Sequence, residues 1–362
     1  MPTSISKPIV AYLHPYLEGR RKEISNGLYP KHHLWGIEAV SKVNSWKIDE
    51  ITTQEFAFPR MLERIVNRTF FRGSPGVRAE FAAWRKAHSC NIIYSVCGPL
   101  TLARHFKKAK LVSWVFRKPD CSPKSRFSPY ARKNLDSHGG FLCLTPEAER
   151  RFAEYGKSKF LPWYVDLQLF DGLPCKQKPQ PPFFLATGKT SRDYNTLIEA
   201  AKATDVQIRI IGPENQCPDV LPPNVQWTNT SDDPPDKAID YPTLREWYAQ
   251  CTGVCIPLTG DPEDTCGYTN LLEAMAMSKP VIMTRSGCLQ LNPEEKKFGF
   301  IVNPSDAIGW ASKINLLARS NELAQRMGTT GRIIAEKEYN SERFGNNVVK
   351  FIGEVLKNEP HK

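Results

Sequence analysis

Residues 251–285 read CTGVCIPLTGDPEDTCGYTNLLEAMAMSKPVIMTR, and this stretch decides the fold. Its apolar run 254–258 predicts a buried strand, and the run 281–283 predicts a second one. Between them a polar loop leads into a helix over 271–277, which opens at GYTN, residues 267–270. Strand, loop, helix and strand form a βαβ unit, and such units bind ligands in the loop before the helix. We therefore expect a ligand site in this loop.

The start of this helix suits a phosphate group, because a helix N-terminus offers N–H donors and the positive end of the helix dipole. Gly267 allows close approach of the backbone, Tyr268 and Asn270 share the same turn, and the Thr269 hydroxyl adds a donor. Glu273 lies among apolar residues, where a carboxylate is costly to bury without a partner. Two interpretations stay open for it. Either it is a solvated helix position, or it accepts hydrogen bonds from two ribose hydroxyls.

The segment 267–282, GYTNLLEAMAMSKPVI, resembles the donor-site signature of retaining GT-B glycosyltransferases, a group that includes sucrose synthases. In that group the signature reads E-x7-E, and its second glutamate, here Glu273, binds the ribose of the nucleotide sugar. The first glutamate falls at Thr265, so the chain departs from the pattern there. Glu263 and Asp264 stand just before it as candidate substitutes.

The resemblance implies an α/β fold of the GT-B type. Two Rossmann-like parallel-sheet domains would face a central cleft, and the C-terminal helix would cross back to the first domain. A length of 362 residues suits two such domains. We predict an acceptor-side domain over 1–174, a proline-rich linker over 175–182, a nucleotide-sugar domain over 183–340 and the crossing helix over 341–362.

A second motif follows the apolar run 183–187, where Gly188, Lys189 and Arg192 resemble the G-R-x-x-x-K loop of the family. Two cations at such a loop would stabilise the diphosphate leaving group as its charge develops, so Lys189 and Arg192 are the predicted catalytic residues. Gly188 joins the donor site. The family places the nucleotide base between the next two strand ends, which makes Gly212 and Trp227 candidates for base contacts.

The first half of the chain matches the family only in outline. In GT-B proteins the loop after the first strand, here 8–13, helps to hold the acceptor. The candidate acceptor-side residues on or beyond this loop, and at the end of a later strand, are Gly27, His32, His33, Trp35 and Arg117.

The amino-acid composition limits the class of protein and its cellular compartment. With 41% hydrophobic and 24% charged residues the sequence is typical of a globular protein, and no apolar run is long enough to span a bilayer. No secretory signal is recognisable, and the ten cysteines contain no C-x2-C pair, which favours reduced thiols in a cytoplasmic protein without a metal site.

The net charge of +11 allows three kinds of partner, which are nucleic acid, an anionic membrane and an acidic small substrate. No nucleic-acid-binding motif accompanies the charge, so we expect no nucleic-acid partner. Peripheral contact with the inner face of a membrane stays open, as does a solvated surface with no partner. The basic clusters are Arg20–Lys22, Lys107–Lys110, Arg117–Lys118, Lys124–Arg126 and Arg132–Lys133.

The predicted function is transfer of a sugar from a nucleoside-diphosphate sugar, UDP before GDP, to an acceptor hydroxyl with retention of configuration. The acceptor would be a sugar, a lipid-linked molecule or a small molecule in glycoconjugate or polysaccharide synthesis. No cofactor is expected, because the cations and the helix dipole replace a metal. Two alternatives stay open, namely a catalytically silent GT-B scaffold and a nucleotide-sugar epimerase of the same fold.

Overall fold

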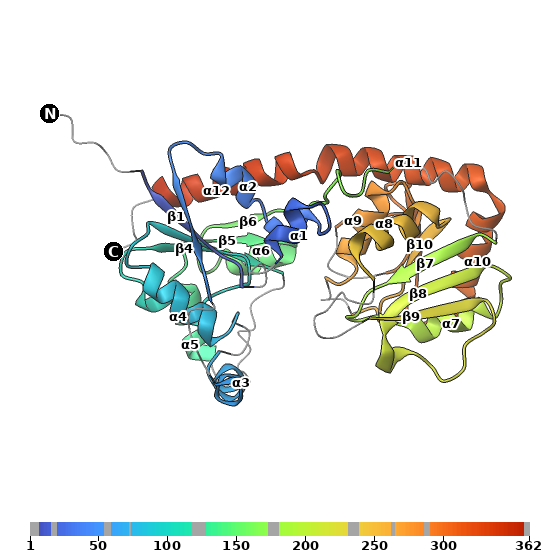
Figure 1. The fold of residues 1–362 in the computed structure, drawn as a ribbon, viewed down its shortest axis with the longest axis horizontal. Coiled ribbons are helices and arrows are strands. Elements are labelled where there is room, and N and C mark those ends of the chain that lie inside the picture. The colour runs from blue at the N-terminus through green and yellow to red at the C-terminus, as the bar shows by residue number, and fades with distance from the viewer. Residues whose placement is uncertain are drawn as a thin grey trace. The chain divides into compact units, whose positions relative to one another are not determined.

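The computed structural model describes residues 7–15, 20–53, 59–71, 74–116, 128–172, 181–230, 239–261, 265–285 and 290–357. The chain forms two compact units, and each contains one six-stranded parallel sheet (Figure 1). The first unit consists of residues 1–23, 32–163 and 342–362, and the second of residues 24–31 and 164–341. The predicted linker 175–182 lies almost wholly outside the described residues.

The first sheet has the strand order β2-β1-β3-β4-β5-β6, with every neighbouring pair parallel. Its strands are β1 (Ile9–Leu13), β2 (Lys47–Ile51), β3 (Ile92–Ser95), β4 (Lys110–Val115), β5 (Gly140–Cys143) and β6 (Ser158–Phe160). The helices of this half are α1 (Arg21–Ser25), α2 (Ile37–Ser41), α3 (Arg60–Thr69), α4 (Val77–Lys86), α5 (Ser128–Leu135), α6 (Pro146–Phe152) and the short 3-10 helices η1 (Lys31–Leu34) and η2 (Thr101–His105).

The last helix of the chain, α12 (Ser341–Lys357), packs on this first sheet. Its Phe344 ring lies 5.3 Å from the ring of Trp114 on β4, measured between centroids. Lys110 at the start of β4 donates to the Val355 carbonyl at 2.9 Å. The apolar face of α12 is fully buried, and each such side chain contributes roughly 1.5–3 kcal/mol before entropy is counted. The predicted return of the last helix to the first domain is confirmed.

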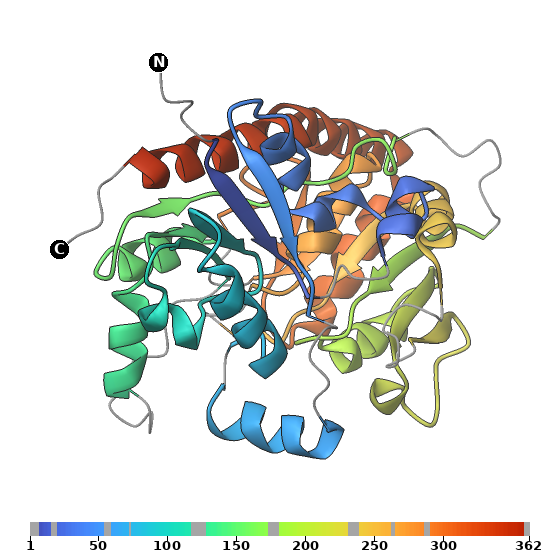
Figure 2. The same ribbon diagram turned by 60° about the vertical axis from the view of Figure 1, so that its left-hand side comes forward.

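The second sheet has the order β12-β11-β10-β7-β8-β9, again parallel throughout. Its strands are β7 (Phe183–Thr187), β8 (Gln207–Pro213), β9 (Val225–Thr230), β10 (Gly253–Ile256), β11 (Val281–Thr284) and β12 (Gly299–Val302). The helices are α7 (Tyr194–Ala201), η3 (Glu214–Gln216), α8 (Tyr241–Gln250), α9 (Tyr268–Ala276), α10 (Ala307–Arg319) and α11 (Asn321–Glu338). Helix α11, drawn in orange-red in Figure 2, is followed along the chain by the red helix α12.

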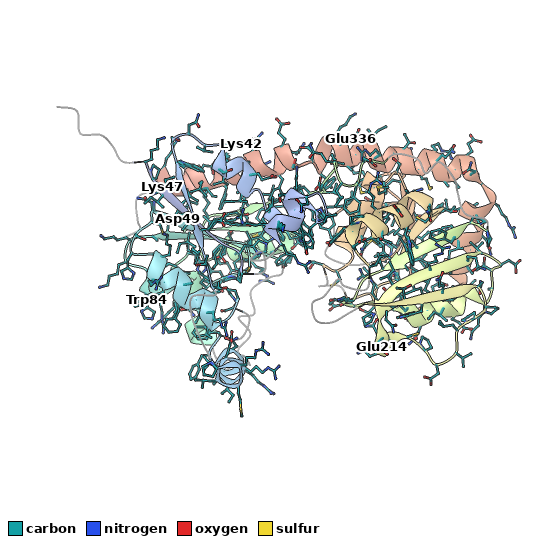
Figure 3. All side chains as sticks on the ribbon, in the orientation of Figure 1. Lys42, Lys47, Asp49, Trp84, Glu214 and Glu336 are labelled. Atoms are coloured by element: carbon teal, nitrogen blue, oxygen red, sulfur yellow. The ribbon has the colours of Figure 1, made fainter. Side chains whose placement is uncertain are left out.

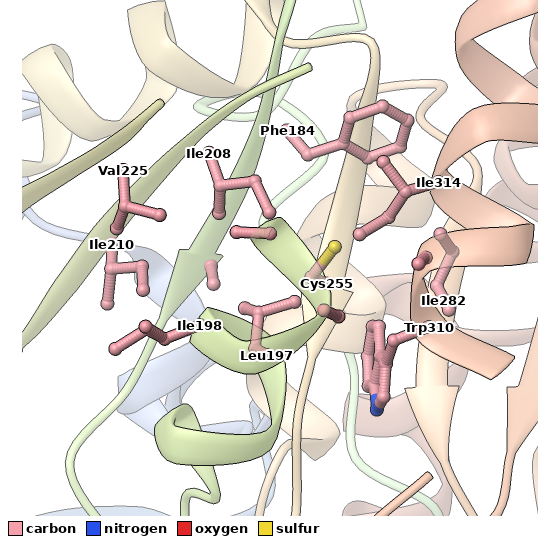
Figure 4. Packing of buried hydrophobic residues seen from close by; sticks show 14 of the residues in the cluster. Phe184, Leu197, Ile198, Ile208, Ile210, Val225, Cys255, Ile282, Trp310 and Ile314 are labelled. Carbon is pink, nitrogen blue, oxygen red and sulfur yellow. The ribbon is translucent and has the colours of Figure 1, made fainter. Parts of the chain in front are cut away.

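Buried apolar side chains of the second sheet pack against those of α7 and α10 and form the core of this unit. The strands read as continuous apolar runs, as expected for parallel strands covered on both faces. Figure 4 shows the packing side chains from α7, α10 and five strands, which are Phe184, Leu197, Ile198, Ile208, Ile210, Val225, Cys255, Ile282, Trp310 and Ile314. These anchors fix the loops at the carboxyl ends of β7, β8 and β10.

Two parallel sheets of Rossmann type confirm the predicted fold class, while the predicted central cleft stays a prediction. Two strands were not predicted from the sequence, β2 and β12. The edge strand β2, with Lys47 and Asp49 labelled in Figure 3, reads KIDEI and buries only Ile51 fully, so it lacks the apolar run that marks the other strands. The segment Thr101–His105 forms the 3-10 helix η2.

Candidate functional site

A cavity of about 180 Å³ opens in the second unit, at the carboxyl ends of β7 and β8 and beside the start of α9. Five residues predicted for the donor site lie in its wall, although they come from two separate motifs. Its lining residues are Thr187, Gly188, Lys189, Ile211, Ile239, Tyr241, Leu244, Thr269, Asn270 and Glu273. The position agrees with the rule that open parallel sheets bind ligands beyond the carboxyl ends of their strands.

The loop after β7 is shaped around Arg192. Its guanidinium donates to the carbonyls of Thr187 and Thr190 and, at 2.6 Å, to Oδ1 of Asn270 on α9. Gly188 has a φ of +133°, and a Cβ there would clash with the guanidinium. Glycine is therefore required so that Arg192 can fold over its own loop. This arrangement ties the predicted cation loop to the first turn of α9.

The start of α9 differs from the other helix starts of the second unit. Asp193, Asp240 and Asp306 cap α7, α8 and α10 through side-chain oxygens. At the start of α9 stands Gly267, in the left-handed conformation with φ +84°, and within the described part of the chain no side chain caps it. Thr269 in this first turn lies in the cavity wall. The uncapped N–H groups suit an anionic ligand.

Glu273 is buried, with 2% of its surface exposed, so the solvated interpretation is wrong. The Tyr248 hydroxyl donates to Glu273 Oε2 at 2.9 Å and accepts from Asn270 Nδ2 at 3.4 Å. Desolvation raises the pKa of Glu273 to about 8, although the hydrogen bonds from Tyr248 and Asn270 act in the opposite direction. A carboxyl group in a cavity wall with a pKa this far from its usual range marks a candidate functional residue.

Helix α8 contributes site residues that sequence analysis missed. Tyr241, Leu244 and Tyr248 follow one another at i, i+3 and i+7 and so share one face of the helix. Tyr241 and Leu244 line the cavity, and Tyr248 holds Glu273. The spacing of these residues was the signal in the sequence, but it does not distinguish a cavity wall from an ordinary core face.

Four predicted donor-site residues do not line the cavity, namely Gly212, Trp227, Gly267 and Tyr268. Trp227 packs over Gly212, where a Cβ would lie 2.6 Å from the indole ring, and its ring centroid is 5.1 Å from that of Tyr194. The Tyr268 side chain is buried beside Tyr339, with 6.5 Å between ring centroids. Gly212 directly follows the cavity residue Ile211, whereas Tyr268 can reach the cavity only through its backbone.

Three of the five acceptor-side candidates surround the Trp163 ring in the first unit. Trp35 stacks on Trp163 at 4.7 Å in the first unit, and His32 lies 5.1 Å from the same indole. The His33 ring lies 5.6 Å from that indole, and the His33 backbone carbonyl accepts from Nε2 of His14 at 2.9 Å. The side chains of Trp35 and His32 are buried in the first unit, and the expectation that they contribute to an acceptor site stays a prediction.

Gly27 belongs to the second unit, where it occupies a turn with φ +71°. Arg117 lies outside the described residues, as do Glu263 and Asp264. Among the described residues no group of three His, Cys, Asp or Glu side chains is placed to hold a metal ion.

A family model described as "Glycosyl transferases group 1" matches residues 191–320, which include Arg192 and the whole of α9. This segment of the second unit is therefore similar to group 1 glycosyltransferases, which confirms the predicted resemblance to that family. Gly188 and Lys189 directly precede the matched segment.

Solved structures of the same fold cover nearly the whole chain. Sucrose-phosphate synthase from Thermosynechococcus elongatus has a TM-score of 0.67 at 15% identity, over 96% of this chain and 99% of that one. A glycosyltransferase from Rickettsia africae has a TM-score of 0.63 at 14% identity, over 98% and 100%. HepE from Anabaena, in complex with UDP-glucose, has a TM-score of 0.60 at 14% identity, over 96% and 100%. No curated protein sequence matches the chain.

Proposed function

We propose that this glycosyltransferase moves a sugar from a nucleoside-diphosphate sugar to an acceptor hydroxyl and retains the configuration at the anomeric carbon. The observation that carries the proposal is the buried Glu273 carboxyl in the wall of a cavity that also contains Lys189 and Thr269. A diphosphate at the start of α9 would place a ribose one turn along, within reach of Glu273. UDP is the favoured nucleotide, with GDP next, since the structural neighbour HepE is solved with UDP-glucose.

The cations of the β7–α7 loop would supply most of the catalysis. As the glycosidic bond breaks, negative charge develops on the diphosphate oxygens. Lys189 in the cavity wall and Arg192 beside Asn270 hold positive charge next to the N-terminus of α9. Groups fixed in advance where charge develops stabilise the transition state, and removing one commonly costs about 10²–10³-fold in rate. This arrangement requires no metal or other cofactor.

The acceptor class follows from the family rather than from the cavity. We propose a sugar, lipid-linked or small-molecule hydroxyl, used in polysaccharide or other glycoconjugate synthesis. Thr265, in place of the first glutamate of the E-x7-E pattern, favours a second candidate function, a silent scaffold that binds the nucleotide sugar without transfer.

The test is product analysis with UDP-glucose, UDP-N-acetylglucosamine and GDP-mannose, first with water and then with sugar acceptors. Proton NMR in the first minutes should show an α-configured product from an α-linked UDP-sugar. A β-configured product would exclude retention. Nucleotide binding without turnover of any donor would favour the silent scaffold.

A further inference from the structure

Exposed apolar side chains concentrate in one short stretch of the first unit. Among the described residues, twelve large hydrophobic side chains are exposed, and six of them lie between positions 61 and 84. These six belong to α3, its C-terminal end and α4, and they are Met61, Leu62, Ile65, Phe70, Phe81 and Trp84. Scattered exposed apolar residues need no explanation, whereas apolar side chains gathered on the outer face of a helix are a candidate interaction surface.

Helix α3 has one face on the protein and one face in solvent. Its inner face rests on the start of α4, where Glu63 pairs with Arg78 at 2.8 Å and Asn67 Oδ1 accepts from the Val77 N–H at 2.7 Å. The outer face carries Met61 and Ile65, which are 78% and 53% exposed. No residue of α3 is buried. The helix is therefore amphipathic, but its apolar stripe points away from the core.

The same outer surface is positively charged. Arg60, Arg64 and Arg68 recur every four residues, so they form a stripe along the helix beside Met61 and Ile65, and all three are exposed. The acidic residues of α3 and α4 do not offset this charge at the surface. Glu63 pairs with Arg78, and Glu80 is buried against backbone N–H groups.

We propose that the α3–α4 face, defined as Arg60, Met61, Leu62, Arg64, Ile65, Arg68, Phe70, Phe81 and Trp84, docks on an anionic lipid surface. Helices that lie in a membrane interface combine an apolar face with basic residues beside it, as α3 does. The arginines would meet anionic headgroups while the apolar side chains enter the acyl boundary. Both ribbon views place α3 at the margin of the first unit, beyond α4 (Figures 1 and 2), and Trp84 points outward from α4 (Figure 3).

This surface differs from the basic clusters that first suggested a membrane partner, because none of those clusters lies between residues 60 and 84. The described helices include none that is long and apolar enough to cross a bilayer, so α3 would lie on the lipid surface rather than span it. The inference rests on side chains of the first unit alone and does not depend on the proposed sugar transfer.

The test is cosedimentation of the full chain with vesicles of phosphatidylcholine alone or with about one third phosphatidylglycerol, at low and high salt. The wild type should bind only the anionic vesicles, and high salt should release it. R64Q/R68Q should lower the partition coefficient about 30-fold, since each basic residue near an anionic surface contributes about fivefold. M61Q/I65Q should lower it at least about tenfold.

Matched controls come from the second unit. I308Q/I333Q removes two exposed apolar side chains, and R326Q/K337Q removes two exposed charges, so each pair should bind vesicles within about twofold of the wild type. Equal losses in the controls, or no wild-type binding to anionic vesicles, would overturn the proposal. A wild-type dimer in light scattering that M61Q/I65Q converts to a monomer would overturn it in favour of a second copy of the chain.

Discussion

Among the described residues each unit buries one glutamate, and the two sites differ in what surrounds the carboxyl group. In the first unit Glu80 of α4 accepts from the backbone N–H groups of Thr101 and Leu102 at 2.6 and 2.9 Å. In the second unit Glu273 of α9 is held by side chains, Tyr248 and Asn270, and borders a cavity. Burial raises the pKa of both groups. The comparison teaches that burial alone does not single out a carboxyl group, whereas burial at the wall of a cavity marks Glu273 as the candidate functional residue.

The same substitution at the two glutamates should have unequal consequences for stability. Glu80→Leu leaves two buried backbone N–H groups without an acceptor, and each unsatisfied group costs about 1–3 kcal/mol. We expect a loss of about 4 kcal/mol in the free energy of unfolding. Glu273→Leu loses one hydroxyl partner but also removes a costly buried carboxyl group, so the net change should stay within about 1 kcal/mol. Urea denaturation measures both values. Equal losses of unfolding free energy in the two variants would contradict the distinction between the two glutamates.

The pH dependence of the free energy of unfolding tests the raised pKa of Glu273. Glu273 has a pKa of about 8 in the folded chain against 4.5 in the reference state. The contribution of Glu273 to the stability of the folded chain is therefore fully present below pH 4.5, and it is lost as the pH rises through 8. Glu273→Gln removes this loss, so the variant should exceed the wild type by about 3 kcal/mol at pH 7 and match it near pH 4. Unfolding at several pH values checks the difference, and a difference independent of pH would refute the raised pKa.

Lys189→Ala should lower the transfer rate about 100-fold, because a fixed cation at the leaving group is removed. Lys189 is only partly buried, so the melting temperature should hardly change. Lys202→Ala, which removes an exposed lysine that pairs with Glu199, is the control and should retain full activity. Steady-state kinetics with the donor found for the wild type provides the measurement. Full activity in the Lys189 variant would remove it from the catalytic residues.

Tyr248→Phe should give the smallest effect, a loss of about fivefold in nucleotide affinity, since it removes one hydrogen bond worth about 1 kcal/mol that orients Glu273. That bond also lowers the pKa of Glu273, so the variant should shift the pH profile of nucleotide binding upward. Calorimetric titration across pH checks both. An unchanged pH profile would show that Tyr248 only fills space.

Sequence reasoning was strongest where short-range patterns coincide with function. The second sheet apart from β12, its linking helices and the wall formed by Lys189, Thr269, Asn270 and Glu273 could be predicted, because apolar strands and the helix start are local signals. The contribution of Tyr248 depends on how α8 packs against α9, which no local pattern encodes.

The first unit was harder to predict for the same reason. Strand β2 has too few apolar residues to be recognised, and the helix α3, whose spacing was recognised, turns its apolar stripe outward. Trp35 resembled a loop residue but stacks on Trp163, a contact between positions far apart in sequence. Long-range packing of this kind decides whether an aromatic residue is a core component or a ligand contact.

The most direct test of a nucleotide site at Glu273 is calorimetric titration of UDP, GDP and ADP into the wild type and into the Glu273→Leu and Glu80→Leu variants. We predict that the wild type prefers UDP, that Glu80→Leu binds it with wild-type affinity at a temperature where it is folded, and that Glu273→Leu binds it at least about 100-fold more weakly. Equal UDP affinity in the wild type and in Glu273→Leu, or no binding of any of the three diphosphates to the wild type, would contradict the account.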